Sequence, residues 1–116
     1  DDIIIVVMLE TPKAIHNVEE IASVPGIDVL LVGTNDLCME MGIPGEFNHN
    51  DVKEAYKKVI QACNNNNILP GLGGVYDETL MHEYIDLGMK FILSGSDLSF
   101  LVKGAEDRLN NLKNKG

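Results

Sequence analysis

Four short apolar runs, each followed by a segment with helical periodicity, constrain the fold of this chain more than any other feature. The runs occupy residues 3–9, 28–32, 68–72 and 91–93. They are continuously rather than alternately apolar, which is typical of parallel strands covered on both faces. The repeated strand–helix order predicts an α/β fold in which right-handed crossovers make the sheet parallel.

The segments after these runs are predicted to be helical. The expected helices cover residues 11–24, 36–41, 51–64, 78–87 and 98–111. Pro12 lies near the start of the first helix, where its fixed backbone angle is favourable. The asparagines at 64–67 and Gly88 mark helix ends, because Asn and Gly tolerate the left-handed cap conformation.

Two architectures suit four such units: a small doubly wound sheet, or half of an eight-stranded (β/α) barrel, which normally needs about 250 residues. The 116 residues are expected to form one domain, 1–116. In either fold, ligands bind in the loops at the carboxyl ends of the strands. These loops are ETP (10–12), GTND (33–36), GGVYDE (73–78) and SGSD (94–97).

Charge and cysteine content limit the partners and the compartment. The formal net charge is −9, which argues against a nucleic-acid partner because phosphate binding needs clustered Lys and Arg. The apolar run 3–9 is too short to cross a bilayer, so no membrane partner is expected. Cys38 and Cys63 lack CxxC spacing and are expected to be reduced, which favours a cytoplasmic location. The chain starts at Asp1 and enters a strand at once, so upstream sequence is expected to have been removed.

Two carboxylates are the first candidates for chemistry. Glu10 ends the first apolar run and Asp36 follows the second, so adjacent parallel strands would bring both to one rim of the sheet. Carboxylates without a nearby His or Cys suit Mg²⁺ or Mn²⁺, which can act as a Lewis acid on a keto oxygen. The alternative is that Glu10 is an ordinary strand-end residue and that Asp36 is a helix cap.

The glycine turns are the second candidates. Gly33 either provides a tight turn or lets the backbone approach a ligand closely. The amides of Thr34, Asn35 and Asp36 would form an anion site for a substrate carboxylate. SGSD repeats this pattern with Ser94, Gly95 and Ser96.

The remaining polar residues point to no further site. His16 and His82 are expected on helix surfaces, and His49 in a loop or at a helix start. Lys90 precedes a strand and is expected to be solvated rather than to form a Schiff base.

Residues 10–37, ETPKAIHNVEEIASVPGIDVLLVGTNDL, carry a family resemblance, which continues in a GIPG loop (42–45), LPGLGG (69–74) and GMKFILSGSD (88–97). The chain resembles the HpcH/HpaI aldolase and citrate lyase β family, which includes 2,4-dihydroxyhept-2-ene-1,7-dioate aldolase. This family belongs to the pyruvate/phosphoenolpyruvate superfamily of TIM-type (β/α)8 barrels. The resemblance covers essentially the whole chain and implies that it forms the C-terminal half of such a barrel.

The resemblance also implies a mechanism. Family members are divalent-metal-dependent (class II) aldolases that cleave 4-hydroxy-2-oxo acids to pyruvate and an aldehyde. Their Glu and Asp metal ligands align with Glu10 and Asp36, and the backbone that binds the pyruvate carboxylate aligns with Gly33, Thr34 and Asn35. The expected cofactor is Mg²⁺ or Mn²⁺, and the expected partner is a small pyruvate-like 2-oxo acid.

The resemblance also shows what this chain lacks. The catalytic Arg and acid/base His of the family lie in the N-terminal half of the barrel, so no catalytic residue of this type is expected here. The chain alone is therefore expected to keep the metal ligands without full activity. Met8 stands where the family often has a substrate-contacting Gln, and Gly73 lies near a pocket position that is usually larger and apolar.

A lone half-barrel would leave unpaired strand edges, so we expect a homo-oligomer or pairing with the missing N-terminal half. Two other hypotheses stay open. One is a citryl- or malyl-CoA lyase-like subunit, for which no thioester site is visible. The other is a noncatalytic binding or scaffold domain.

Overall fold

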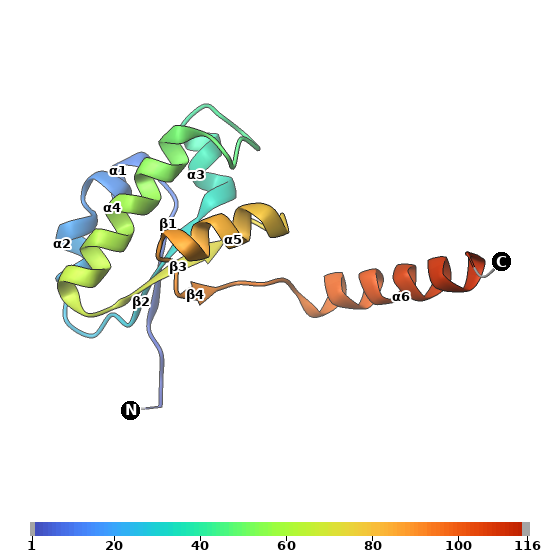
Figure 1. Cartoon of the computed structure of the whole chain (residues 1–116). Coiled ribbons are helices and arrows are strands. Elements are labelled where there is room, and N and C mark those ends of the chain that lie inside the picture. The colour runs from blue at the N-terminus through green and yellow to red at the C-terminus, as the bar shows by residue number, and fades with distance from the viewer. Residues whose placement is uncertain (1, 115–116) are drawn as a thin grey trace.

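A computed structural model describes residues 2–114 of the predicted domain. Four strands alternate with six helices (Figure 1). The strands are β1 (Val6–Leu9), β2 (Val29–Gly33), β3 (Leu69–Gly73) and β4 (Phe91–Ile92). The helices are α1 (Pro12–His16), α2 (Val18–Ala22), α3 (Thr34–Glu40), α4 (Asn50–Asn66), α5 (Glu78–Leu87) and α6 (Asp97–Lys113). This is the α/β order predicted from the sequence.

The strands form one parallel sheet in the order β1-β2-β3-β4. Side chains alternate between its two faces, which we call the outer and the inner face. The outer face carries Val7, Leu9, Leu30, Val32, Leu72 and Ile92, which pack into one core with helices α1 to α5. The inner face carries Val6, Met8, Val29, Leu31, Leu69 and Phe91, and Val6, Met8 and Leu69 are exposed there. A doubly wound sheet would have helices on both faces, so this arrangement supports the half-barrel.

On the inner face, the side chain of Leu31 in β2 packs against two glycines of β3, Gly71 and Gly73. An ideal Cβ on Gly71 would lie 2.9 Å from Cδ1 of Leu31, and one on Gly73 would lie 3.2 Å from the same atom. The side chain of Leu31 therefore covers two residues of the neighbouring strand, and it is only 5% exposed.

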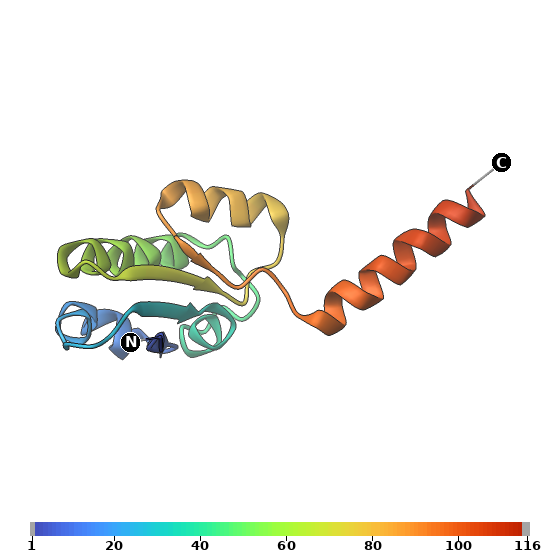
Figure 2. The same ribbon diagram turned by 90° about the horizontal axis from the view of Figure 1, so that it is seen from below.

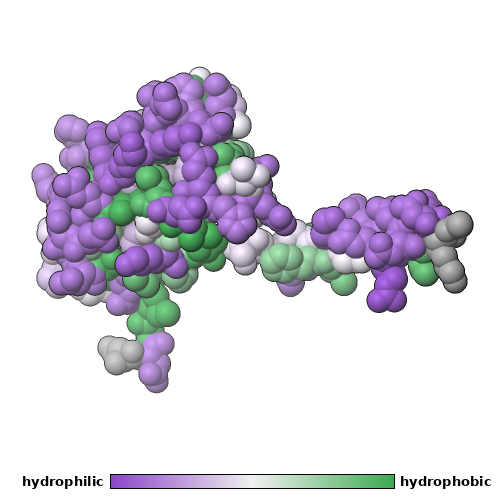
Figure 3. Space-filling view, in the orientation of Figure 1, coloured by the Kyte–Doolittle hydropathy of each residue, from purple (hydrophilic) through white to green (hydrophobic). Residues whose placement is uncertain are grey.

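Helix α6 extends away from the rest of the molecule (Figures 1 and 2), and none of its residues is buried. The radius of gyration is 16.6 Å, above the roughly 13 Å expected for a compact domain of this length. Figure 3 shows apolar surface on the part of α6 nearest the sheet and on the extended segment before β1. Within residues 2–114, no helix has the length and apolar character that a membrane crossing requires.

Most element boundaries differ from the prediction by one or two residues, and three of the differences have clear local reasons. The first strand begins at Val6, not at residue 3, because β2 begins at Val29 and leaves Ile3 and Ile4 without a neighbouring strand. The predicted helix 11–24 is divided at Asn17, which ends α1 and begins α2. Helix α3 starts at Thr34, two residues earlier than predicted, with Gly33 at the cap position.

Two predicted helix ends are confirmed. Asn67 ends α4 in the left-handed conformation with φ 57°, and Gly88 is the C-cap of α5 with φ 135°.

Candidate functional site

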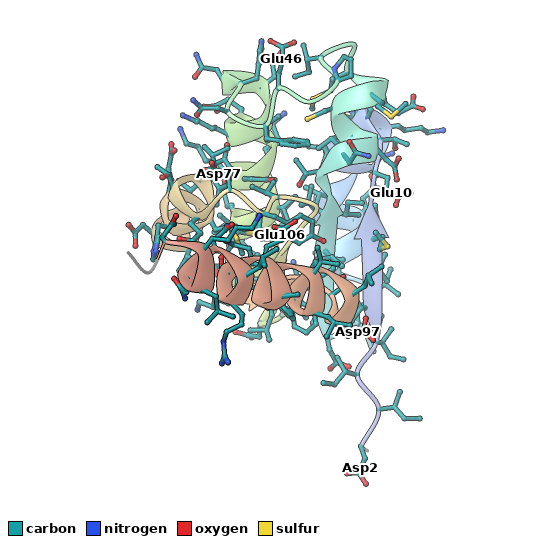
Figure 4. All side chains as sticks on the ribbon, turned by 90° about the vertical axis from the view of Figure 1, so that its right-hand side faces the viewer. Asp2, Glu10, Glu46, Asp77, Asp97 and Glu106 are labelled. Carbon is teal, nitrogen blue, oxygen red and sulfur yellow. The ribbon has the colours of Figure 1, made fainter. Side chains whose placement is uncertain are left out.

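Glu10 lies directly after β1, at the carboxyl end of the sheet (Figure 4). The next residue, Thr11, is the N-cap of α1, and its Oγ1 accepts a hydrogen bond of 3.1 Å from the Ala14 amide. Glu10 therefore does not cap this helix. Its side chain is half-buried and has no hydrogen bond or ion pair with any residue that the structure describes.

Asp36 lies in the first turn of α3, which follows β2, the strand next to β1. The N-cap of α3 is Gly33, and no side chain donates or accepts a cap hydrogen bond there. Asp36 is exposed, and within residues 2–114 its carboxylate has no hydrogen-bond or ion-pair partner. The sequence left open whether these carboxylates are structural caps, and the hydrogen bonds of α1 and α3 assign neither of them that role.

Gly33 is the last residue of β2, and it lies next to the side chain of Glu10, which follows β1. An ideal Cβ on Gly33 would lie 2.8 Å from Cγ and 3.1 Å from Oε1 of Glu10. It would also lie 3.3 Å from Cε of Met8. With φ at −81°, the backbone of Gly33 suits any residue, so the missing side chain matters because it leaves room for Glu10. The Glu10 carboxylate thus lies over the turn that leads to Asp36.

The amides of Thr34 and Asn35 lie beside a second glycine, at the end of β3. An ideal Cβ on Gly74 would lie 3.4 Å from the Asn35 nitrogen and 3.6 Å from the Thr34 nitrogen. Gly74 has φ at +82°, a conformation that L side chains rarely adopt, so this space is kept free of a side chain. Two backbone amides therefore lie beside Gly74, next to the turn at Gly33.

The side chain of Thr34 points the other way, into the core. Its hydroxyl forms a 2.6 Å hydrogen bond with the hydroxyl of Tyr56 in α4. Only the backbone of Thr34 is thus available to a ligand. No sequence signal pairs Tyr56 with Thr34, which lies 22 positions away.

Tyr56 and Tyr84 pack edge to face, with ring centroids 4.6 Å apart. The Tyr84 hydroxyl donates to the carbonyl of Phe47, in the loop between α3 and α4. Burial raises the pKa of Tyr56 well above its ordinary value, and burial also raises the pKa of Tyr84, to about 12. Both phenols are neutral at physiological pH, so they act as hydrogen-bonding groups rather than as acids or bases.

The SGSD segment does not repeat the geometry of GTND at the same place. Ser96 is the N-cap of α6, where its hydroxyl accepts from the Ser99 amide at 3.1 Å, so this hydroxyl already has a structural role. The segment follows β4, which is separated from β1 by two strands. The structure therefore groups Gly33, Thr34, Asn35 and Asp36 with Glu10, and it leaves Ser94 and Gly95 apart from them.

The histidines and Lys90 lie where the sequence predicts. His16, His82 and Lys90 are exposed, and Nδ1 of His49 caps α4 by accepting from the Asp51 amide at 3.0 Å. Cys38 and Cys63 are free and buried, and burial raises the pKa of both thiols, that of Cys63 to about 11. In the described part of the chain, no three His, Cys, Asp or Glu side chains are grouped so that they could hold a metal ion. A cation at Glu10 and Asp36 would therefore take its other ligands from water, substrate or another segment.

The sequence of this chain is similar to those of known aldolases. The chain is 39% identical over 105 residues to the 4-hydroxy-4-methyl-2-oxoglutarate aldolase of Chaetomium globosum, covering 89% of this chain and 39% of that protein. It is 33% identical over 106 residues to the 4-hydroxy-2-oxo-heptane-1,7-dioate aldolase of Klebsiella pneumoniae, covering 91% of this chain and 40% of that one. The chain thus spans about two-fifths of the length of these relatives.

Two solved structures are similar to this chain in fold. An HpcH/HpaI aldolase from Desulfitobacterium hafniense matches 99% of this chain with 44% of its own, with a TM-score of 0.83 and 26% identity. A family protein from Burkholderia cenocepacia matches 97% with 43% of its own, with a TM-score of 0.86 and 28% identity. The model of the HpcH/HpaI aldolase/citrate lyase family matches residues 1–104. With sequence, fold and family model in agreement, this chain belongs to the HpcH/HpaI aldolase/citrate lyase family.

Proposed function

We propose that this chain provides the metal-binding part of a divalent-metal-dependent (class II) pyruvate aldolase, with Glu10 and Asp36 as the protein ligands. The observation that carries this proposal is the position of Glu10, whose unpaired carboxylate lies over Gly33 at the start of the turn to Asp36. Two carboxylates suit Mg²⁺ or Mn²⁺, which prefer oxygen ligands and accept water and substrate oxygens as the others. When bound, such a cation would stabilise negative charge on the keto oxygen of the substrate.

The proposed substrate is a 4-hydroxy-2-oxo acid, cleaved to pyruvate and an aldehyde. Its carboxylate would accept hydrogen bonds from the backbone amides of Thr34 and Asn35, which follow Gly33 in the turn and lie beside Gly74. The thioether of Met8 lies beside Glu10 and can accept only weak hydrogen bonds, so it would give the substrate an apolar contact. The names of the aldolase relatives support this substrate class.

We infer that residues 1–116 form half of the catalytic barrel. Four parallel strands, helices over the outer face only, and a match to less than half of each solved relative support this inference. The acid/base His and the Arg of the reaction would come from the other half. Without proton transfer by a positioned side chain, the chain alone would lose about 10²- to 10⁴-fold in rate.

We also propose that this chain associates with another protein segment through its sheet edges and through α6. β1 and β4 are the edges of the sheet, and Leu98, Leu101 and Leu112 of α6 are each more than 60% exposed. Unpaired edges and an apolar helix side both favour a protein partner, which we propose to be a second copy of the chain or the N-terminal half of the barrel. The free buried thiols support a reducing compartment such as the cytoplasm.

Calorimetric titration with Mn²⁺ tests the metal site. We expect the wild-type chain to bind Mn²⁺, and we expect Glu10→Gln and Asp36→Asn each to weaken binding at least about 10-fold. Glu46→Gln is the matched control, because it removes an exposed carboxylate on the loop after α3 without changing either proposed ligand. Unchanged Mn²⁺ binding in the Glu10→Gln/Asp36→Asn double variant would remove the proposed site.

Pyruvate release from a 4-hydroxy-2-oxo acid tests the half-barrel. We expect little turnover by the 116-residue chain at saturating Mn²⁺. Rapid turnover by this chain alone would show that the missing His and Arg are not needed. Sedimentation showing a compact monomer at micromolar concentration would contradict the proposed association.

A further inference from the structure

Apart from tyrosines and cysteines, Thr34 is the single polar or charged residue in the described part of the chain that is fully buried. It is the first residue of α3 and lies two positions before Asp36. Its hydroxyl and that of Tyr56 are 2.6 Å apart, a normal distance for a strong hydrogen bond between hydroxyls. A buried hydroxyl without this partner would lose its bond to water and gain nothing in return.

The start of α3 has no other side-chain hydrogen bond among the described residues. Gly33, at the cap position, provides no side chain, and no other side chain caps the helix. Asp36 is exposed and unpaired within the described chain, so nothing on its own side chain holds it in place. Leu37 and Cys38 pack into the core one turn later, and the bond from Thr34 to Tyr56 is the side-chain hydrogen bond that ties the turn itself to the core.

The position of Tyr56 is fixed by the residues packed around it. It is fully buried in the middle of α4, and the ring of Tyr84 packs edge to face against it. Tyr84 is equally buried, but its hydroxyl binds the carbonyl of Phe47, a loop residue seven positions after the end of α3. Two similar tyrosines thus hold different segments: Tyr56 holds the turn that carries Asp36, and Tyr84 holds the loop that follows.

We infer that Tyr56 is a positioning residue for the metal-binding turn 33–36, and that it acts through the hydroxyl of Thr34. The inference rests on the proposed function, because it takes Asp36 as a metal ligand. Partners that orient metal ligands typically contribute about 10- to 100-fold to metal affinity. Tyr56 has this effect without touching the cation or the substrate.

The test compares Tyr56→Phe with Tyr84→Phe in the full 116-residue chain. Each variant removes one buried hydroxyl and keeps the ring. We expect Tyr56→Phe to weaken Mn²⁺ binding about 10-fold and Tyr84→Phe to change it less than about twofold, although both lower the melting temperature. Thr34→Val should behave like Tyr56→Phe, whereas Thr34→Ser keeps the hydroxyl and should restore wild-type affinity.

A second measurement needs no metal. The amides of Leu37 and Cys38 close the first turn of α3, so their hydrogen exchange reports how firmly this turn is held. We expect faster exchange at these two amides in Tyr56→Phe and Thr34→Val, and wild-type exchange in Tyr84→Phe and Thr34→Ser.

The two measurements separate the two proposals. If wild-type protein does not bind Mn²⁺, the proposed function fails, and the exchange data still decide whether Tyr56 holds the turn. If Tyr56→Phe and Tyr84→Phe change exchange and Mn²⁺ affinity equally, Tyr56 has only a general structural role and the inference is wrong. If Tyr56→Phe does not fold, the comparison of Thr34→Ser with Thr34→Val gives the same decision.

Discussion

The outer face of the sheet is covered by helices of the same chain, whereas the inner face has no helix over it. Leu30 and Val32 of β2 are completely buried on the outer face. On the inner face, Val29 and Leu31 of the same strand are buried, but Val6, Met8 and Leu69 are 38–53% exposed. Burial of apolar surface is the main source of folding free energy. The outer face therefore supplies more of the folding free energy than the inner face. The candidate metal ligands lie at the edge of the less buried inner face.

Leu30→Ala should have the largest effect on this comparison. It removes a fully buried side chain from the core of the outer face, and we expect the free energy of unfolding to fall by about 2–5 kcal/mol. Leu69→Ala is the matched change on the inner face, where the side chain is 44% exposed, and it should cost about 1 kcal/mol or less. Urea denaturation followed by circular dichroism measures both. Equal losses would show that the inner face is as well packed as the outer one.

Gly33→Ala should displace the side chain of Glu10 at the candidate site. The new Cβ would overlap Cγ of Glu10, so we expect a loss of about 1–3 kcal/mol in stability and about 10-fold in Mn²⁺ affinity. Gly104→Ala is the control, because an added Cβ there meets no atom within 4 Å. An alanine variant at position 33 that binds Mn²⁺ as the wild type does would show that the contact between Gly33 and Glu10 is unimportant.

Alkaline pH should weaken the outer layer through its tyrosines. The pKa of Tyr84 is raised to about 12 in the folded state, against about 10 in the unfolded chain, so the unfolded state loses its proton first. The contribution of Tyr84 to stability should be constant below pH 10 and should fall by on the order of 1–2 kcal/mol between pH 10 and 12. Urea denaturation at several pH values measures this. Tyr84→Phe should show a shallower fall, and an unchanged slope would contradict the assignment.

Leu101→Ser should have the smallest effect on folding. Leu101 is 71% exposed on α6, which belongs to neither face of the sheet, so the free energy of unfolding of the monomer should change by less than about 0.5 kcal/mol. Sedimentation should instead show weaker self-association. A large loss of monomer stability would mean that α6 packs against its own chain in solution.

Local signals explain which parts of the fold were predictable. Helix α5 has the predicted bounds, because Asp77 and Gly88 mark its two ends. Helix α3 was predicted two residues late, since Asp36 resembles a cap and the actual cap, Gly33, has no side chain to signal it. Strand β1 was predicted too long, because its extent depends on where β2 begins.

The candidate site was predictable at the level of topology. Adjacent parallel strands place the ends that carry Glu10 and Asp36 at one rim, and the structure has β1 beside β2. The contact of Glu10 with Gly33 and the bond between Thr34 and Tyr56 were not predictable. Both join residues that are more than 20 positions apart in sequence, and packing alone determines them.

The space that Leu31 shares with Gly71 and Gly73 limits how these positions can change. A larger residue at position 73 would meet Cδ1 of Leu31, 3.2 Å from its Cβ, and the Val32 carbonyl at 3.1 Å. A shorter side chain at position 31 would remove the contact with Cδ1, but it would leave the Val32 carbonyl in place and would open a cavity at a side chain that is only 5% exposed. The backbone of β2 therefore restricts position 73 to small residues whatever stands at position 31, so the shape of the inner face beside β3 is set by the strand spacing as well as by side chains.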